Sequence, residues 1–369
     1  MKKLKKLTAL LTAIGMVAAM SACGSNTDSG NAGAAASSAA APAATEAAET
    51  TAAPAEAGSV AEAGSAAETE TAAADGDTYL IGICQLVQHE ALDAATQGFK
   101  DALTEQLGDK VKFDEQNASG DSANCSTIVN GFLSENVDLI LANATAPLQA
   151  AAAATSDIPV LGTSVTDYAT ALEIDNWTGT VGTNVSGTSD LAPLDQQAAM
   201  IKELFPDAKK VGLLYCTAEP NSVYQCDTIE GYLKDEGYEV ERYAFNDTND
   251  VTSVTQTACD NSDVIYIPTD NTAASNTEAI ANVVLPAKVP VVAGEEGICK
   301  GCGVATLSIS YYDLGYTTGQ MAAKILTEGA DVTTMPVESA SAVTKKYNAA
   351  NCEALGITIP DDYEAIAEE

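Results

Sequence analysis

Polar side chains follow the first segment of this sequence that has the pattern of a buried strand. Residues 79–84 form a continuous run rich in β-forming residues, which is typical of a parallel strand covered on both faces. Gln85, Gln88 and His89 come directly after it, and His89 is the only histidine in the chain. Because ligands of open α/β sheets lie outside the carboxyl ends of the strands, this turn is the first candidate for ligand contacts.

The residue pattern does not favour catalysis. The sequence has no G-x-S-x-G motif, and no nucleophile is marked beside the single histidine that a Ser-His-Asp triad would need. It also has no Walker A motif, and its first strand lacks the G-x-G-x-x-G of dinucleotide sites. The sequence therefore predicts a binding protein without a cofactor. An exported α/β hydrolase is the alternative from another class.

The cysteines give one candidate pair for a disulfide bond. The chain has nine, and eight of them fall in the part that should fold. Several lie in expected strands or helices, as buried small hydrophobic residues do. Cys299 and Cys302 have the C-x-x-C spacing, so they are expected either as a local disulfide or as free thiols. No second C-x-x-C supplies two more ligands, so no metal site is expected.

The elements that must position these residues alternate regularly along the chain. Strands are expected at 79–84, 110–117, 137–142, 158–162, 210–215, 238–243, 264–268, 289–292, 305–310 and 339–344. Helices are expected at 91–106, 122–135, 147–154, 195–204, 222–236, 253–260, 272–285, 312–326 and 348–355. Such β-α-β repeats imply parallel sheets with helices on both faces.

A polar interlude at residues 163–192 divides this alternation into two runs. The predicted fold class is therefore α/β, with two doubly wound Rossmann-like lobes, a hinge and a ligand cleft between the lobes. Lobe 1 is expected to hold residues 78–188 with 311–336, and lobe 2 residues 189–310 with 337–369.

The N-terminal part has the pattern of an export signal and a tether. Residues 1–22 combine a lysine-rich start, an apolar run and a small-residue exit, as secretory signal peptides do. The position of Cys23 resembles the lipobox of bacterial lipoproteins, in which this cysteine becomes the lipidated first residue. Residues 23–77 are rich in Ala, Ser, Thr and Glu and predict a disordered linker. The expected location is the outer face of the cell membrane, reached through the lipid anchor only.

The charge excludes a nucleic-acid partner. The chain carries 17 basic and 52 acidic residues, for a net charge of −35. Binding to phosphate backbones needs basic patches. A strongly acidic surface instead keeps an exported protein soluble.

Several blocks of residues together resemble a known family. The blocks are 82–89, 91–94, 117–121, 144–147, 163–167, 187–190, 214–222, 267–271 and 311–315. They are similar to the substrate-binding lipoproteins of ABC importers, in the tryptophan/tyrosine/phenylalanine-type group with the type I periplasmic-binding fold. The resemblance implies capture of an aromatic amino acid by hinge closure and delivery to a membrane permease driven by a separate ATPase subunit.

The sequence also departs from this family near the expected cleft. Gln88-His89-Glu90 stands where the family usually has Glu-His-Pro, residues 170–183 with Trp177 look longer than the usual loop, and residues 294–302 differ from the usual version. These departures leave other ligands open, such as another amino acid, a nucleoside or a sugar. A surface sensor that presents its ligand to a receptor is the alternative role.

The resemblance assigns chemistry to residues at the expected strand ends. Hydroxyls of Thr145, Ser164 and Ser189 would bind the carboxylate of an amino acid. Asp190, Asp270 or Glu295 would bind its ammonium, and one of these carboxylates should dominate. The full set of expected ligand-binding residues is Gln85, Leu86, His89, Thr145, Ser164, Asp167, Ser189, Asp190, Asn221, Ser222, Asp270, Asn271, Glu295, Tyr311 and Tyr312.

Purely structural roles remain open for several of these residues. Asp167 is equally suited to a turn, His89 to a helix cap or a core position, and Tyr312 to packing between the lobes. Asp270 and Asn271 are also placed to cap a helix, a role that is compatible with facing a cleft. Trp177 is a weaker candidate for an aromatic wall.

Overall fold

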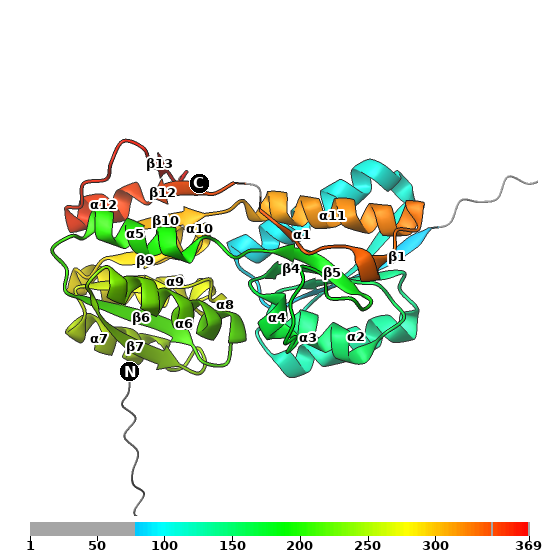
Figure 1. Cartoon of the computed structure of the whole chain (residues 1–369), viewed down its shortest axis with the longest axis horizontal. Coiled ribbons are helices and arrows are strands. Elements are labelled where there is room, and N and C mark those ends of the chain that lie inside the picture. The colour runs from blue at the N-terminus through cyan, green and yellow to red at the C-terminus, as the bar shows by residue number, and fades with distance from the viewer. Residues whose placement is uncertain (1–77, 341, 368–369) are drawn as a thin grey trace, which may run out of the picture. The chain divides into compact units, whose positions relative to one another are not determined.

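The computed structural model describes residues 78–340 and 342–367 and contains two sheets (Figure 1). The first has the strand order β11-β5-β4-β3-β1-β2 and the second β13-β12-β10-β9-β8-β6-β7. The pairings are parallel except that of β10 with β12. We call the first sheet with its helices lobe 1, and the second sheet with its helices lobe 2.

Lobe 1 is built from two stretches of the chain. Its strands are β1 (Tyr79–Gln85), β2 (Val111–Asn117), β3 (Leu139–Asn143), β4 (Val160–Val165), β5 (Val185–Ser189) and β11 (Glu338–Ser339). Its helices are α1 (Glu90–Leu107), α2 (Ser122–Glu135), α3 (Thr145–Ala154), α4 (Tyr168–Ala171) and α11 (Tyr311–Glu328), with short 3-10 turns at Gly108–Lys110 and Val332–Thr334.

Lobe 2 repeats this plan. Its strands are β6 (Lys210–Cys216), β7 (Glu239–Phe245), β8 (Val264–Ile267), β9 (Val291–Ala293), β10 (Ala305–Ser308), β12 (Thr344–Tyr347) and β13 (Glu364–Ala365). Its helices are α5 (Leu194–Leu204), α6 (Pro220–Asp235), α7 (Val251–Asn261), α8 (Asn271–Ala274), α9 (Thr277–Ala287), α10 (Glu296–Cys302) and α12 (Ala349–Leu355).

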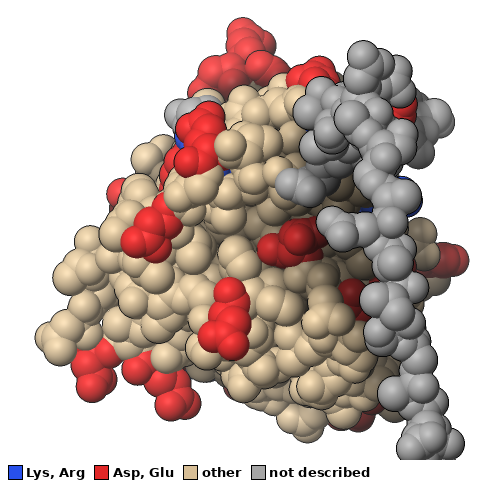
Figure 2. Space-filling view, turned by 90° about the vertical axis from the view of Figure 1, so that its right-hand side faces the viewer, with Lys and Arg blue, Asp and Glu red and all other residues tan. Residues whose placement is uncertain are grey.

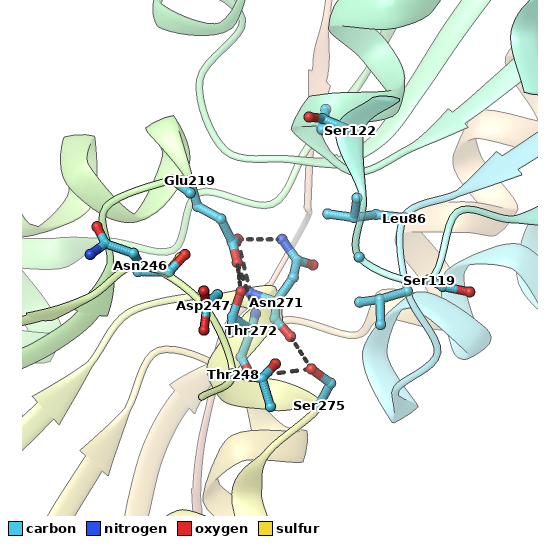
Figure 3. A pocket seen from close by; sticks show the side chains of 15 residues that line it. Leu86, Ser119, Ser122, Glu219, Asn246, Asp247, Thr248, Asn271, Thr272 and Ser275 are labelled. Atoms are coloured by element: carbon cyan, nitrogen blue, oxygen red, sulfur yellow. Dashed lines mark hydrogen bonds between the residues drawn. The ribbon is translucent and has the colours of Figure 1, made fainter. Parts of the chain in front are cut away.

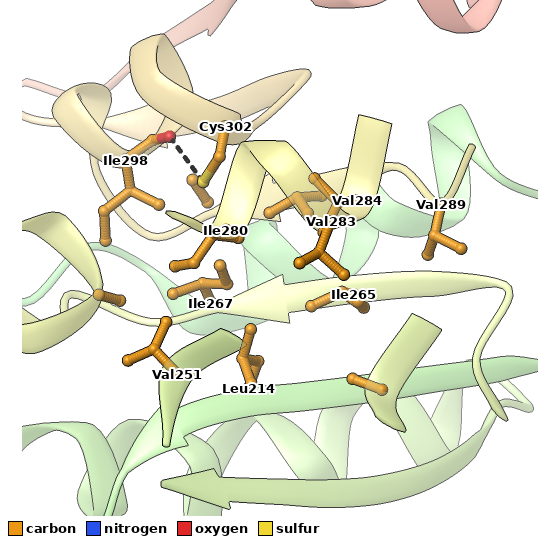
Figure 4. Close-up of a cluster of buried hydrophobic side chains, with 14 of the residues drawn as sticks. Leu214, Val251, Ile265, Ile267, Ile280, Val283, Val284, Val289, Ile298 and Cys302 are labelled. Carbon is orange, nitrogen blue, oxygen red and sulfur yellow. Dashed lines mark hydrogen bonds between the residues drawn. The ribbon is translucent and has the colours of Figure 1, made fainter. Parts of the chain in front are cut away.

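Both lobes bury their sheets between two layers of helices, which confirms the predicted α/β class. In β1, Ile81 and Ile83 belong to the core beneath α1 and α11, whereas Cys84 belongs to the core beneath α2 and α3. Figure 4 shows the corresponding core of lobe 2, where Leu214 and Ile265 of the sheet meet apolar residues of α7, α9 and α10. A strand covered on both faces favours apolar residues along its whole length, which is why these strands have no alternating pattern.

The chain crosses between the lobes after β5, after β10 and after β11. The predicted boundaries at 188 and 336 are wrong by a few residues, because Ser189 ends β5 and because Glu338 of β11 pairs in parallel with Thr188. The strand predicted at 339–344 is also wrong. It divides into the ends of β11 and β12, which belong to different sheets because this segment is itself a crossing.

A seam of glycines brings α1 and α11 into close contact. A Cβ atom at Gly98 would lie 2.1 Å from the Tyr312 backbone oxygen, and one at Gly315 would lie 1.9 Å from the Ala95 backbone oxygen. At Gly319 the corresponding distance, to the Phe99 backbone oxygen, is 2.6 Å. The two helix backbones therefore touch without side chains between them. This contact fixes the start of α11, where Tyr311 lies.

The surface is acidic, as the composition predicts. On the face shown in Figure 2, acidic side chains are spread between neutral residues with few basic ones in view. Within the described residues no helix is both long and apolar enough to cross a membrane. The predicted signal (1–22), lipidation site (Cys23) and linker (23–77) lie outside the described residues.

Candidate functional site

A small polar chamber lies between the two lobes, at the carboxyl ends of their strands. Its lining residues are His89, Leu92, Ser164, Asp190, Asn221, Thr269, Asp270, Asn271, Ala274, Glu295 and Tyr311. The chamber has a volume of about 10 Å³, which is room for about one water molecule. The lobes are therefore closed on each other around it.

Asp190 contributes a carboxylate oxygen that has no partner among the described residues. Its Oδ2 accepts a hydrogen bond from the Tyr311 hydroxyl at 2.9 Å, whereas its buried Oδ1 accepts none. Burial raises the pKa of Asp190 above its ordinary value, against the opposite effect of the Tyr311 and Thr166 hydroxyls. A buried carboxylate with a free acceptor is suited to a cationic ligand group, which would restore the stability of its charged form.

Ser164 contributes the second unpaired polar atom of the chamber wall. Its side chain is buried, and its Oγ has no hydrogen-bond partner among the described residues. Its backbone has a φ of 55°, in the left-handed region that non-glycine residues rarely adopt, within the register shift between β4 and β5. A hydroxyl held in this way can donate to an acceptor such as a ligand carboxylate.

The two acidic residues that lobe 2 adds to the chamber are already engaged by the backbone. Asp270 accepts from Ala273 N at 2.8 Å and from Cys216 N at 2.6 Å. Glu295 accepts from Gly297 N at 2.7 Å and also from Ile298 N, at the start of α10. Both cap short helices. Of the three carboxylates that the sequence proposed for an ammonium, Asp190 is thus the one with an unpaired oxygen.

Burial raises the pKa values of these two capping acids, Asp270 and Glu295. It raises the pKa of Asp270 to about 8, with the nearby Glu219 charge adding to the shift, and it raises the pKa of Glu295 to about 7. Hydrogen bonds from the backbone oppose both shifts without cancelling them. The closed site therefore favours the protonated form of Asp270 near neutral pH and brings Glu295 close to half protonation there.

The ligand-free protein is expected to lose thermal stability as the pH rises from about 5 to about 8. Because the folded pKa values of Asp270 and Glu295 lie above the ordinary 3.8 and 4.5, the folded state binds their protons more tightly than the unfolded chain. Their contribution is complete below the unfolded pKa values and is lost as the pH rises through the folded ones. Scanning calorimetry should show the melting temperature falling by roughly 5 °C across this range.

The variant Glu295→Gln isolates the contribution of one of these groups to the pH dependence. It should make the melting temperature less dependent on pH, whereas the exposed control Glu353→Gln should keep the wild-type slope. Equal slopes in wild type and Glu295→Gln would contradict the assignment of the raised pKa to Glu295.

Direct hydrogen bonds join the lobes on two sides of the chamber. On one side, His89 Nε2 lies 3.1 Å from Asn271 Oδ1. On the other, Thr166 Oγ1 of lobe 1 lies 3.4 Å from Thr269 Oγ1 and 3.4 Å from Gln225 Nε2, both of lobe 2. Both contacts are made directly between protein groups of the two lobes.

A second, larger pocket opens beside the chamber, and Figure 3 shows it from close by. Its volume is about 220 Å³, and Asn271 lines both spaces. Lobe 1 supplies Leu86 and Ser119 to its wall, and lobe 2 supplies Glu219 and Thr272. We call this space the mouth pocket. It leads from the chamber wall outward, because the loop at 246–248 that borders it is exposed.

The structure brings eight of the predicted residues together around the chamber. They are His89, Ser164, Asp190, Asn221, Asp270, Asn271, Glu295 and Tyr311. Leu86 instead lines the mouth pocket, and Ser222 is buried behind the chamber beside Asn221, whose Nδ2 lies 3.3 Å from Ser222 Oγ. Thr145 is buried at the start of α3 and does not line the chamber.

The remaining predicted residues have other partners. The Gln85 amide bonds to Asp93 and Thr96 within lobe 1, and Asp167 caps α4 through Thr170 N at 2.7 Å. Ser189 Oγ donates to the Thr166 backbone oxygen at 2.8 Å. None of these three lines the chamber.

Two of the aromatic candidates, Tyr312 and Trp177, lie away from the chamber. Tyr312 is 40% exposed and donates to Asp101 on α1 at 2.9 Å, although it borders a separate cavity near the hinge. Trp177 is 39% exposed and stacks on Tyr168, with the ring centres 6.4 Å apart. Neither ring forms part of the chamber wall.

Sequence reasoning missed Glu219, whose carboxylate organises the lobe 2 side of the site. Its Oε2 accepts from Asn271 Nδ2 at 2.7 Å, and its Oε1 accepts from Thr272 N at 2.8 Å. The sequence did contain a feature that could have indicated Glu219. This residue follows β6 and directly precedes a proline at the first position of α6. Thr166, Thr269 and Gln225 were also missed. Small polar residues after strand ends, such as the two threonines, give no distinct pattern, and neither does a glutamine inside a helix, such as Gln225 in α6.

The cysteine alternatives are decided in favour of free thiols. The eight cysteines between 84 and 352 are free and buried, including Cys299 and Cys302. Burial also raises the pKa of the Cys352 thiol, to about 11. No cluster of three or more His, Cys, Asp or Glu side chains suited to a metal ion occurs in the described part of the chain.

Comparison with known proteins finds several related sequences and structures. The chain is 39% identical over 260 residues to the tyrosine-binding protein of Clostridioides difficile (strain R20291), covering 70% of this chain and 75% of that protein. Among solved structures, it is similar to an ABC domain in complex with L-Trp from Streptococcus pneumonia. That match has 32% identity and a TM-score of 0.75, and covers 79% of this chain and all of the other.

A third relative is a substrate binding protein with adhesive properties from Clostridium difficile, in its ligand-free, open structure. This match has 36% identity, covers 79% of this chain and 100% of the other, and has a TM-score of 0.61. The family model described as ABC transporter substrate binding protein matches residues 80–369, which is most of the sequence. With two lobes, a chamber between them and these relatives, the chain belongs to the ABC transporter substrate binding protein family.

Proposed function

We propose that this protein captures an aromatic amino acid in the chamber between its lobes. Members of its family are binding proteins rather than enzymes, work in the extracellular or periplasmic space, and pass a small molecule to an ABC permease. The observation that carries the choice of ligand is the pair of unpaired atoms in the chamber wall, Asp190 Oδ1 and Ser164 Oγ. Relatives whose names or titles refer to tyrosine and L-Trp support the same choice.

The polar end of an amino acid matches this pair chemically. The α-ammonium would donate to Asp190 Oδ1, which has no other donor, and the Tyr311 hydroxyl would hold the second oxygen in place. The Ser164 hydroxyl would donate to the α-carboxylate. Charge-assisted bonds of this kind are stronger than neutral ones and gain further strength in a site from which water is excluded.

The ring must enter while the lobes are apart. A chamber of about 10 Å³ holds no aromatic side chain, so the apolar wall of Leu92, Ala274 and Tyr311 has to move outward to receive one. The chain superimposes better on the L-Trp complex than on the open structure, with TM-scores of 0.75 and 0.61, although the open protein is more similar in sequence. This difference supports hinge closure as the binding mechanism.

Two measurements on the purified protein test the ligand. Mass spectrometry of the small molecules released on denaturation should identify tyrosine, tryptophan or phenylalanine. Isothermal titration calorimetry of protein refolded without ligand should show binding of these three and not of leucine, myo-inositol or ribose. Binding of a sugar or polyol with no response to the aromatic amino acids would overturn the proposed ligand and leave the family assignment unchanged.

We also propose that Cys23 carries the lipid that holds the protein at the outer face of the cell membrane. The support is the sequence alone, in which this cysteine follows a signal-type segment. Two acyl chains give stable attachment where one is marginal. In cells, Cys23→Ala should move the protein from the membrane fraction to the medium or periplasm. Retention of Cys23→Ala in the membrane fraction would contradict lipidation at this residue.

A further inference from the structure

The side chains of His89, Asn271 and Glu219 form a continuous hydrogen-bonded chain across the gap between the lobes. His89 is the N-cap residue of α1 in lobe 1, and Asn271 is the first residue of α8 in lobe 2. His89 Nε2 lies 3.1 Å from Asn271 Oδ1, and Asn271 Nδ2 donates to Glu219 Oε2 at 2.7 Å. No ligand or bridging group is needed to complete it.

Glu219 fixes the orientation of Asn271. Its Oε2 accepts from both the backbone N (3.0 Å) and the side-chain Nδ2 of Asn271, and its Oε1 accepts from the backbone N and hydroxyl of Thr272, each at 2.8 Å. Because a carboxylate only accepts hydrogen bonds, the amide nitrogen of Asn271 must face Glu219. The amide oxygen must therefore face His89, and His89 Nε2 must carry the hydrogen.

The hydrogen bond between His89 and Asn271 also lies where it can close the chamber. His89 and Asn271 both line the chamber, and Asn271 also lines the mouth pocket, whereas His89 borders a further cavity on the outer side near Lys300. The bond thus stands in the wall that separates the chamber from both outer spaces. When it forms, it joins the lobes and closes that wall in one step.

We propose that His89, Asn271 and Glu219 form a latch that holds the lobes closed independently of the ligand, with Glu219 as its positioning residue. The latch supports the solute-binding function but does not depend on which solute binds. Its formation after ligand entry slows escape of the ligand. Its formation in the empty protein produces a closed form with a sealed chamber, which must open before a ligand can enter.

The test measures the distance between the lobes in ligand-free protein by double electron–electron resonance. Nitroxide labels on Ser134→Cys in α2 and Ser253→Cys in α7 report on lobe 1 and lobe 2, because both positions are exposed while the described native cysteines are buried. Wild-type protein should show a closed population without ligand. His89→Ala and Asn271→Ala should each lower the closed-to-open ratio about fivefold, as the loss of one hydrogen bond predicts.

Combining the substitutions separates a latch from independent effects. The double variant His89→Ala/Asn271→Ala should lower the ratio no further than either single variant, because both remove the same bond. Glu219→Ala should also lower it, and adding His89→Ala should then have little effect. Asn130→Ala, on an exposed helix position of lobe 1, is the matched control and should keep the wild-type distances.

Each possible result either supports or overturns the latch. A ligand-free wild type that is entirely open, single variants with wild-type distances, or additive effects in the double variant would each overturn it. Circular dichroism and melting curves establish that the variants are folded. Because all these distances are measured without ligand, a wrong amino-acid assignment would leave the outcome unaffected.

Discussion

Replacing Asp190 by asparagine is expected to weaken the binding of an aromatic amino acid by about 100-fold, or about 3 kcal/mol. The substitution keeps the size and shape of the side chain but removes the negative charge beside the proposed ammonium. In the closed form Asp190 is 4% exposed, so water cannot replace the lost charge. An ammonium buried against a neutral amide keeps most of its desolvation cost without an opposite charge to offset it.

Titration calorimetry at several pH values tests this role. Burial raises the pKa of Asp190 above its ordinary value, whereas an ammonium beside it favours the ionised carboxylate, so a proton and the ligand compete for this group. Wild-type affinity should therefore fall as the pH is lowered. Asp190→Asn should bind weakly with much less dependence on pH.

The exposed acid Asp207 provides the matched control. Asp207→Asn makes the same chemical change on the surface and should keep the affinity and pH dependence of the wild type. An Asp190→Asn variant that binds within about threefold of wild type would show that another group neutralises the ammonium. The next variant to measure would then be Glu295→Gln, since Glu295 also lines the chamber.

Replacing Gly315 by alanine is expected to destabilise the folded protein by about 3 kcal/mol or more. The added Cβ would lie 1.9 Å from the Ala95 backbone oxygen, well inside contact distance. That oxygen belongs to a helix, so it cannot move away as a flexible side chain would. The substitution must therefore push α1 and α11 apart and expose part of the core that both helices cover.

Thermal unfolding measures this effect, and Gly131→Ala is its control. At Gly131, on an exposed position of α2, an added Cβ meets nothing within 4 Å, so alanine should stabilise that helix by up to about 1 kcal/mol. Gly315→Ala should lower the melting temperature by roughly 10 °C. It should also weaken ligand binding, because Tyr311 starts the displaced helix. A melting temperature at or above that of wild type would show that the helices have room to separate.

The sequence was sufficient to predict the fold class and to propose the strand ends as the place of the site. Continuous apolar runs such as 79–84 and 264–268, rich in β-forming residues, are typical of strands that helices cover on both faces, and their alternation with helices leaves few possible topologies. Ligands then lie at the carboxyl ends of the strands, which is where His89, Asp190 and Asn271 were expected. This rule depends on chain direction alone, so it holds without knowledge of side-chain packing.

Tertiary structure decided what each of these residues does. Asp190, Asp270 and Glu295 were equivalent in the sequence, but two of them accept backbone N–H groups of short helices and one keeps an oxygen unpaired. Those N–H groups come from turns whose geometry follows from the assembled lobe. The local sequence therefore indicated three carboxylates and could not choose among them.

The two adjacent tyrosines of α11 show the same limit of prediction from sequence. Both were expected to bind the ligand, but neighbouring residues of a helix point about 100° apart, so the two side chains face different surroundings. The glycine seam sets how α11 packs on α1, a helix more than two hundred residues earlier, and thereby directs Tyr311 to Asp190 and Tyr312 to Asp101. The sequence by itself determined two α/β lobes and the strand ends at which a ligand would lie. Only the tertiary structure decided which atoms there remain unpaired, because that depends on contacts between segments far apart in the chain.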